Sequence, residues 1–170
     1  PIGPAAELKL KPKEEFPQKN YFLVEELIQA NGANKFLEIT GGMLFSFQNG
    51  QKKVDVFEPS ETLSTGDVLS LEEKFLAGEG QNITPARFST DPMAQNKISA
   101  QVREVLGKVA LQLQVEGYCR IDAFVRIFDT GKVEVVIIEI NSLPGMTPAT
   151  CIFHQSAIYG LKPFQFIDKI

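Results

Sequence analysis

Two strand-like segments in the last third of the chain carry acidic side chains at positions where they could hold a metal ion. The segments read GYCRIDAFVRIF (117–128) and KVEVVIIEIN (132–141), and β-branched and aromatic residues are frequent in both. Asp122 lies in the first segment, and Glu139 and Asn141 lie in the second. Burying a carboxylate without a partner costs free energy, so other residues of the fold or a bound group must compensate these charges.

The two segments predict a β-hairpin whose register brings the polar residues together. A loop of two residues at 130–131 places Asp122 directly opposite Glu139. The same register sets Arg120 opposite Asn141, and a four-residue loop preserves it, whereas a three-residue loop breaks it. Because side chains on a strand alternate with a period of two, both acids are then expected on one face of the sheet.

Two opposed carboxylates limit what can occupy this face of the hairpin. Like charges directly opposite each other destabilise a sheet, so the pair needs water, a shared proton or a cation between its members. Oxygen ligands suit Mg²⁺, which takes one or two carboxylates and completes its coordination with water and substrate phosphate. Asn141 can add an amide oxygen. The pattern predicts a metal held together with a nucleotide; the alternative is a solvated face on which the acids are merely exposed.

The composition is that of an ordinary globular protein. The chain has 170 residues, 44% of them hydrophobic, which is enough for one sizeable core. A net charge of −4 without a lysine or arginine run argues against binding to nucleic acid or to a membrane surface. No stretch approaches the roughly 18 apolar residues of a membrane-spanning helix, and no signal-peptide pattern opens the chain. Cys119 and Cys151 show no disulfide or zinc spacing, so a cytoplasmic location is expected.

The N-terminal part of the chain predicts a lead-in followed by one domain. Residues 1–20 are rich in proline and charge, whereas residues 21–170 carry the strand and helix patterns. The chain begins at Pro1 without an initiator methionine, which favours a processed product or a piece of something longer. At the start of the domain, YFLVEELI (21–28) is strand-like.

The middle of the chain predicts a hairpin, a long loop and a helix. KFLEITGGMLFSF and KKVDVF flank an Asn-Gly dipeptide at 49–50, which is typical of a two-residue hairpin turn. Residues 58–90 predict a long loop with little regular structure. A helix is expected to open at Asp91 and to close at Gly117, with an apolar face formed by Ile98, Val102, Val105, Leu106, Val109 and Leu113. These elements predict an α+β fold in which helices pack against an antiparallel sheet.

The C-terminal block resembles the ATP-grasp superfamily, and in particular the D-alanine-D-alanine ligase family. GYCRIDAFV and EINSLPGMTPAT are similar to the family pattern G-x-x-R-x-D followed by E-x-N-x-x-P-G-M-T. LSLEEKFLAGEGQNITPARF resembles the mobile loop of the family, and LVEELI with KFLEITGGML resembles its adenine hinge and the next strand. The resemblance covers residues 21–170 and implies the C-terminal part of an ATP-grasp domain.

The resemblance implies residues that bind Mg²⁺ and ATP phosphates. Asp122, Glu139 and Asn141 would hold one or two Mg²⁺ ions, with Glu139 bridging them and Mn²⁺ as an alternative ion. Arg120 would stabilise charge on the forming acyl phosphate, and its alternative role is a salt bridge with Asp122 or Glu139. Lys74 would reach the nucleotide phosphates from the loop.

The resemblance also implies positions for the adenosine part of the nucleotide. Backbone groups of Glu26, Leu27 and Ile28 would meet the adenine edge. The carboxylates of Glu25 and Glu38 would lie nearby, and Glu38 would accept hydrogen bonds from the ribose hydroxyls. A solvent-exposed edge strand is the alternative explanation of these two acids.

A turn and a helix start after the hairpin suggest a carboxylate site. Leu143-Pro144-Gly145 predicts a tight turn, followed by a helix that begins near Pro148. The positive end of that helix attracts a carboxylate. The resemblance assigns Gly145 and Thr150 to the second amino acid substrate, with Thr150 standing where the family has serine; the alternative role of Thr150 is an ordinary N-cap.

The implied activity is ATP-dependent ligation of two D-alanine molecules for peptidoglycan precursors, through an acyl phosphate, with this chain as the C-terminal part of the enzyme. The alternatives are an ATP-grasp ligase that joins other amino acids and a nucleotide-binding fragment without turnover. Two departures stand out: Phe75 replaces the family's tyrosine, and no counterpart of the N-terminal substrate domain or of the glycine-rich flap precedes Tyr21. The expected partners are therefore ATP, D-alanine and the N-terminal portion of the same ligase, with a homodimer as an alternative for the full-length protein.

Overall fold

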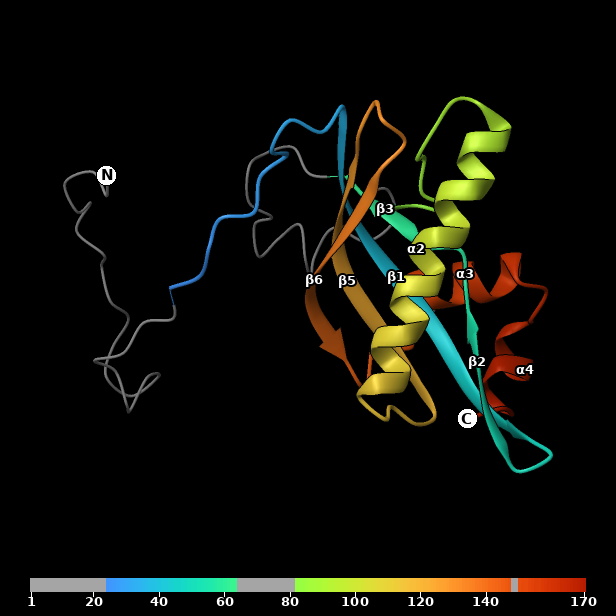
Figure 1. Ribbon diagram of the computed structural model, residues 1–170. Coiled ribbons are helices and arrows are strands. Elements are labelled where there is room, and N and C mark those ends of the chain that lie inside the picture. The colour runs from blue at the N-terminus through green and yellow to red at the C-terminus, as the bar shows by residue number, and fades with distance from the viewer. Residues whose placement is uncertain (1–23, 64–81, 148–149) are drawn as a thin grey trace, which may run out of the picture.

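The computed structural model describes residues 24–63, 82–147 and 150–170, and in these ranges the chain forms an antiparallel sheet flanked by helices (Figure 1). The sheet has the order β4-β3-β1-β5-β6, with β2 also paired to β1. Its strands are β1 (Lys35–Gln48), β2 (Gln51–Val56), β3 (Ser60–Thr62), β4 (Asn82–Ile83), β5 (Tyr118–Ile127) and β6 (Val133–Asn141). The helices are α2 (Pro92–Gln112), α3 (Cys151–Ile158) and α4 (Pro163–Ile167). The expected α+β class with an antiparallel sheet is confirmed.

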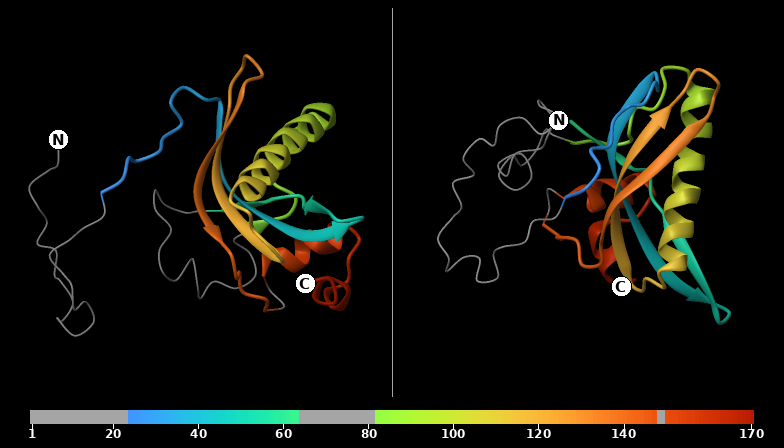
Figure 2. Two further views of the ribbon diagram at one scale, coloured as in Figure 1. Left: turned by 60° about the horizontal axis from the view of Figure 1, so that its bottom comes forward. Right: turned by 60° about the vertical axis from the view of Figure 1, so that its left-hand side comes forward.

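Helices cover the two faces of the sheet unequally, as Figure 2 shows. The long helix α2 packs on one face, and its apolar side chains meet those of the strands in the main core. This core includes Ile39, Met43, Phe45, Val102, Leu106, Ile121 and Val125. The short helices α3 and α4 lie on the other face, around a second cluster of Leu44, Phe57, Tyr118, Ile152 and Phe166. None of the helices in the described ranges is long and apolar enough to cross a membrane.

Two adjacent glycines allow helices to approach β1 from both sides. A Cβ atom on Gly41 would lie 2.4 Å from Cδ1 of Leu106 in α2. A Cβ atom on Gly42 would lie 2.5 Å from Oε1 of Gln155 in α3. Because side chains alternate across a strand, the two glycines serve opposite faces. The ITGGML sequence is therefore explained by close packing.

The β1–β2 hairpin is confirmed at the predicted turn. Gln48 pairs with Gln51, which leaves a two-residue loop. Asn49 and Gly50 have φ angles of +52° and +76°, the left-handed conformation that a type I′ turn requires at both positions.

Residues 24–30 form no regular element, so the expected strand at 21–28 is wrong for the part that the structure describes. Val24 and Leu27 are 87% and 71% exposed, because no apolar layer formed by the described residues receives their side chains. The segment is instead held by a hydrogen bond of 2.7 Å from Nε of Arg126 to the carbonyl of Gln29.

The loop between β5 and β6 differs from the predicted one. The N–H of Phe128 donates to the carbonyl of Lys132 at 3.0 Å, and Gly131 has a φ of +78°. The loop therefore has three residues, 129–131, with glycine in the left-handed position. The expected two- or four-residue loop is wrong, and near the turn the strands pair one residue out of the predicted register.

A β-bulge cancels this shift before the polar residues are reached. Ala123 pairs with Ile137, whereas Asp122 pairs with Glu139, so Ile138 is an extra residue on β6. The bulge turns Glu139 to the face of Asp122, and the predicted pairs are restored beyond it. Without it, Ile138 would oppose Asp122, and Glu139 would point toward the apolar face.

The long helix begins as predicted and ends earlier. The side chain of Asp91 accepts from the N–H of Ala94 at 2.8 Å and caps the first turn. The helix ends at Gln112 rather than at Gly117, because the left-handed residue that stops it is Gln114, with a φ of +55°. Leu113, expected on the apolar face, is consequently 58% exposed.

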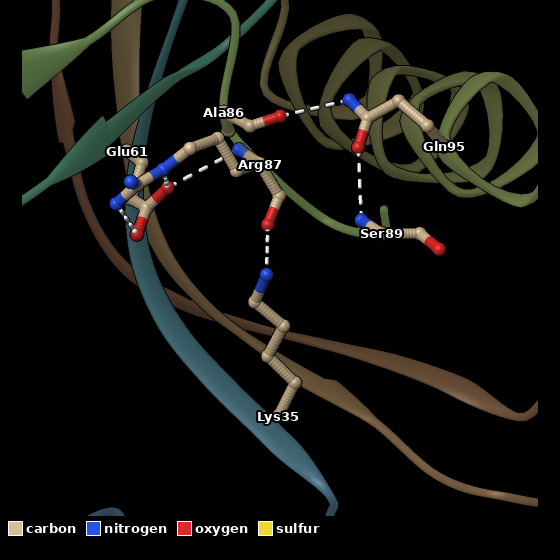
Figure 3. Close-up of polar contacts among 6 residues, drawn as sticks. All are labelled: Lys35, Glu61, Ala86, Arg87, Ser89 and Gln95. Carbon is tan, nitrogen blue, oxygen red and sulfur yellow. Dashed lines mark hydrogen bonds and ion pairs between the residues drawn. The ribbon is translucent and has the colours of Figure 1, made fainter. Parts of the chain in front are cut away.

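Within 58–90, described in part, an ion pair holds short strands against the loop that follows them. Glu61 in β3 is almost fully buried, and its carboxylate accepts from Nε and Nη2 of Arg87 at 2.9 and 3.0 Å (Figure 3). The amine of Lys35 donates to the carbonyl of Arg87. Burial by itself raises the pKa of Glu61, but the hydrogen bonds from Arg87 outweigh it and hold that pKa below its usual range. The segment LSLEEKFLAGEGQNITPARF, which resembles the mobile loop of the family, lies mostly outside the described residues.

The Glu61–Arg87 pair predicts that the free energy of unfolding falls as the pH is lowered. Because the folded pKa of Glu61 is depressed, the pair contributes above the ordinary carboxyl value of 4.5 and is lost as the pH falls through the lower folded value. Glu61→Gln should lower the free energy of unfolding at pH 7 and flatten its fall between about pH 5 and 3. Urea unfolding at each pH measures this, with the exposed Glu116→Gln as control. Parallel acid profiles for wild type and Glu61→Gln would contradict the assignment.

Candidate functional site

Asp122 lies at the centre of a group of hydrogen-bond donors on the open face of the sheet. The hydroxyl of Thr40 donates to Oδ1 of Asp122 at 2.6 Å. Arg120 forms a two-pronged ion pair with it, from Nε to Oδ1 at 3.0 Å and from Nη2 to Oδ2 at 2.9 Å. The carboxylate is 15% exposed, so these donors replace most of the water that it would otherwise bind. Strands β1 and β5 bring the three side chains together.

Glu139 and Asn141 complete the group from β6. Nδ2 of Asn141 lies 3.4 Å from Oδ2 of Asp122 and 3.3 Å from Oε1 of Glu139, so one amide spans both carboxylates. The prediction that the two acids are cross-strand neighbours, with Asn141 on the same face, is confirmed. Glu139 itself is exposed, and water therefore shares in solvating its charge.

The donor set fits a hard divalent cation that keeps part of its hydration shell. Asp122 and Glu139 supply carboxylate oxygens, and Asn141 supplies an amide oxygen if its side chain turns to present Oδ1 in place of Nδ2. Within the described ranges, no cluster of three or more His, Cys, Asp or Glu side chains could hold an ion. Two carboxylates without imidazole or thiolate match Mg²⁺, which completes its coordination with water and phosphate, better than Zn²⁺.

Arg120 takes its alternative role as a salt-bridge partner of Asp122, and that contact keeps its guanidinium in the site. Its side chain remains 34% exposed on the open face. In the sheet it faces Gly42 of β1 and Asn141 of β6. A planar guanidinium held beside a carboxylate in this way is also placed to meet an anionic group.

The residues expected around adenosine separate into two places. Glu25, Glu26 and Leu27 are exposed in the irregular segment 24–30, and Ile28 is half-buried there. Glu38 lies in β1, two residues before Thr40, and therefore on the same face as Asp122.

Two aromatic side chains that were not predicted from the sequence lie on the same face of the sheet as Asp122. Phe36 and Phe124 stack with ring centroids 5.0 Å apart and planes at 25°. Phe36 precedes Glu38 by two residues and Phe124 follows Asp122 by two, so both rings lie on the face of the acids. This period-two spacing is a signal that could have identified them.

The residues expected at a carboxylate site lie together. A Cβ atom on Gly145 would lie 3.9 Å from Cγ2 of Thr150, which places the two residues in contact. The expected helix start near Pro148 is wrong: α3 begins at Cys151, with Thr150 as its N-cap residue. The hydroxyl of Thr150 donates to the carbonyl of Thr147 at 2.8 Å instead of capping the helix. It would have to change partner to donate to a substrate.

Lys74 lies outside the described residues.

Neither cysteine is suited to nucleophilic chemistry. Burial raises the pKa of Cys119 to about 11, and that residue is fully enclosed in the core. Burial also raises the pKa of Cys151, whose thiol lies close enough to Ser60, Arg120 and Asp122 to be affected by them. This proximity of Cys151 to the polar group was missed by sequence interpretation.

This chain is similar in sequence to known proteins. The sequence matches the family described as D-ala D-ala ligase C-terminus over residues 5–170. It is 30% identical over 126 residues to the D-alanine–D-alanine ligase of Leptospira interrogans, covering 74% of this chain and 33% of that protein. The ligase of Caldicellulosiruptor bescii is 27% identical over 164 residues, covering 96% of this chain and 40% of that protein. The chain thus spans between a third and two fifths of the length of these curated relatives.

A solved structure shows the same fold. D-alanyl-alanine synthetase A from Vibrio cholerae superposes with a TM-score of 0.55 at 23% identity, over 79% of this chain and 37% of that one. A D-alanine–D-alanine ligase from Bacillus anthracis, complexed with ATP, superposes with a TM-score of 0.50 at 17% identity. At these identities the likeness is one of fold, and it agrees with the expected C-terminal part of an ATP-grasp domain.

The hydrogen bond from Thr40 predicts a role in holding Asp122 for a cation. Thr40→Val keeps the size and removes the hydroxyl, so it should weaken Mn²⁺ binding by about 10- to 100-fold, the usual effect of losing a residue that orients a metal ligand. Mn²⁺ titration followed by electron paramagnetic resonance measures the affinity. Thr130→Val, in the exposed β5–β6 loop, is the control. Equal affinities in the two variants would show that Thr40 does not orient the ligand.

Proposed function

Because the chain belongs to the D-ala D-ala ligase C-terminus family, we propose that it is the C-terminal part of an ATP-dependent ligase that joins two D-alanine molecules. The observation that carries the proposal is the placement of Asp122, Glu139, Asn141 and Arg120 on one open face by the bulged β5–β6 hairpin. The product would be a D-alanyl-D-alanine dipeptide for peptidoglycan precursors.

The proposed reaction has two steps that share one acyl phosphate. The carboxylate of the first D-alanine attacks the γ-phosphorus of ATP, and ADP leaves. The amine of the second D-alanine then attacks the acyl carbon, phosphate leaves, and the nitrogen loses a proton. Both steps move negative charge between oxygens, so fixed positive groups aimed at those oxygens are expected to supply much of the catalysis.

In this proposal, the carboxylates and the amide of the site hold the cation, and two basic side chains meet the phosphates. Asp122, Glu139 and Asn141 would hold one or two Mg²⁺ ions, and Mn²⁺ would be a substitute. Mg²⁺ would neutralise phosphate charge. Arg120, already beside Asp122, stabilises the acyl phosphate, and Lys74 contacts the nucleotide phosphates.

The proposed nucleotide position follows from the same face. Backbone groups of Glu26, Leu27 and Ile28 would meet the edge of the adenine, with Glu25 beside them. Glu38 would accept from the ribose hydroxyls, since it lies two residues from Thr40 on the strand that borders Asp122.

The stacked rings of Phe36 and Phe124 offer an apolar surface for the adenine base. The carboxylate of the second D-alanine would lie at Gly145 and Thr150, at the start of α3.

Two alternatives keep this site and change what the protein does with it. An ATP-grasp ligase could join other amino acids, because the site described here does not select the first amino acid. A nucleotide-binding fragment could also lack turnover. We propose that the partner of this chain is the N-terminal portion of the same ligase, since the chain spans only between a third and two fifths of the length of its relatives. We propose a homodimer for the complete protein. A cytoplasmic location is also proposed, since both cysteines are free.

The isolated 170-residue chain is predicted to form no dipeptide. A large share of the catalysis in such a ligase comes from holding both substrates in line, which needs parts beyond the site described here. The chain should bind Mg²⁺-ATP weakly. With ATP, Mg²⁺ and D-alanine supplied, phosphate release and dipeptide formation are assayed together, and the mass of the native gene product is measured. Turnover at about 1 s⁻¹ or more would show that these 170 residues suffice.

Removal of the carboxylate of Glu139 is predicted to abolish metal-dependent nucleotide binding while the fold remains intact. Glu139 is exposed, so its truncation leaves no cavity in the core. The readout is calorimetric titration of ATP into the native gene product with and without Mg²⁺. Glu104→Ala, an exposed acid on α2, controls for the change in net charge. Binding that depends on Mg²⁺ equally in both variants would rule out the proposed site.

A further inference from the structure

A fully buried glutamine on α3 fills a gap in the edge of β1. Strand β2 pairs with β1 up to Met43, and β3 pairs with it from Thr40. The N–H of Phe57 still donates to the carbonyl of Gly42 at 3.0 Å, and the chain then leaves β1 at residues 58–59. The side chain of Gln155 reaches into this gap from α3 and is 0% exposed.

The amide of Gln155 bonds to β1 as a neighbouring strand would. Its Oε1 accepts from the N–H of Gly42 at 2.8 Å. Its Nε2 donates to the carbonyl of Thr40 at 2.8 Å and to Oγ of Ser60 at 2.8 Å. A buried amide with donor and acceptor both satisfied holds its neighbours in one arrangement. The same closeness explains why glycine occupies position 42, where a Cβ atom would lie 2.5 Å from Oε1.

The backbone that Gln155 holds is the part of β1 that borders the site. On its other edge, β1 sets Thr40 opposite Asp122 and Gly42 opposite Arg120. The carbonyl of Thr40 points to Gln155 and therefore away from β5. Thr40 and Asp122 are consequently a non-hydrogen-bonded pair of the antiparallel sheet, the kind of pair in which opposite side chains come closest. That geometry allows the Thr40 hydroxyl to reach Asp122 at 2.6 Å.

The same glutamine belongs to the helix that begins at the expected carboxylate site. Thr150 is the N-cap of α3, five residues before Gln155. Ile152 lies one turn before Gln155 on the helix, and its Cγ1 is 3.1 Å from the position that a Cβ atom on Gly42 would take. One short rigid helix thus carries Thr150 at its start and Gln155 at its contact with the sheet.

We propose that Gln155 is a positioning residue that sets the distance between the second-substrate carboxylate site at the start of α3 and the Arg120–Asp122 pair. This inference rests on the proposed function and deepens it. The attacking amine is attached to the carbon that bears the carboxylate, so a shift of α3 along β1 moves the amine away from the acyl carbon. Displacements on the order of 1 Å can reduce turnover by about 100-fold.

A second glutamine provides a matched control, because it makes the same kind of contact elsewhere. Oε1 of Gln95 accepts from the N–H of Ser89 at 2.9 Å, and its Nε2 donates to the carbonyl of Ala86 at 2.8 Å (Figure 3). These bonds fix the loop before α2 and do not include Thr40 or Gly42. If Gln155 only stabilised the fold, loss of either amide would have the same kind of effect.

The experiment compares Gln155→Leu with Gln95→Leu in the native gene product, with ATP, Mg²⁺ and D-alanine. Both variants should lower Tm, since Gln155→Leu leaves buried backbone groups unpaired and Gln95→Leu leaves part-buried ones unpaired. Gln155→Leu should also raise the KM for the second D-alanine and lower kcat, together by about 10- to 100-fold in kcat/KM. Gln95→Leu should leave both constants at wild-type values. Kinetic constants that change equally in the two variants would overturn the inference.

A second pair of variants covers the case in which Gln155→Leu does not fold. Gly42→Ala keeps the glutamine and pushes its amide away, whereas Gly41→Ala crowds Leu106 on the opposite face. Gly42→Ala should raise the KM for the second D-alanine and Gly41→Ala should not; equal values would overturn the inference. A wild-type native gene product that forms no dipeptide would refute the proposed function itself and this inference with it. An active wild type with indistinguishable variants would refute the inference alone.

Discussion

One extra residue in β6 decides whether this protein has a site. The three-residue loop after β5 sets a register in which Ile138 would oppose Asp122 and Glu139 would point into the apolar layer under α2. The bulge at Ile138 turns Glu139 to the opposite face, next to Asp122. Val133, Val135 and Ile137 before the bulge and Ile140 beyond it pack against the core, whereas Glu139 and Asn141 lie on the opposite face. The bulge therefore decides which side chains at the end of β6 join the core and which reach Asp122.

Two acids can share this face because donors surround one of them and water reaches the other. Thr40 and Arg120 satisfy Asp122, Asn141 spans the pair, and Glu139 is exposed. Thr40, Arg120 and Asn141 lie on the neighbouring strands β1, β5 and β6, so the sheet itself supplies these donors. A bound cation would act on an arrangement in which two of the three oxygen ligands are already adjacent.

The two helical layers have different tasks. The long helix α2 completes the main core and needs only apolar complementarity, which Gly41 allows at close range. The short helix α3 approaches the other face through Gly42 and is bound to β1 by the buried amide of Gln155. In the proposed function, a nucleotide and an amino acid would meet on the open face of the sheet.

The sequence by itself determined the antiparallel hairpins, the start of α2 and the pairing of Asp122 with Glu139, because these follow from local turn residues and from period-two and period-3.6 patterns. Even so, that pairing was predicted through a loop of the wrong length. Only the tertiary structure decided the bulge at Ile138, the irregular course of residues 24–30 and the contact of Gln155 with β1. Each of these depends on which distant segment supplies an edge, a layer or a hydrogen-bond partner, and no local pattern encodes that choice.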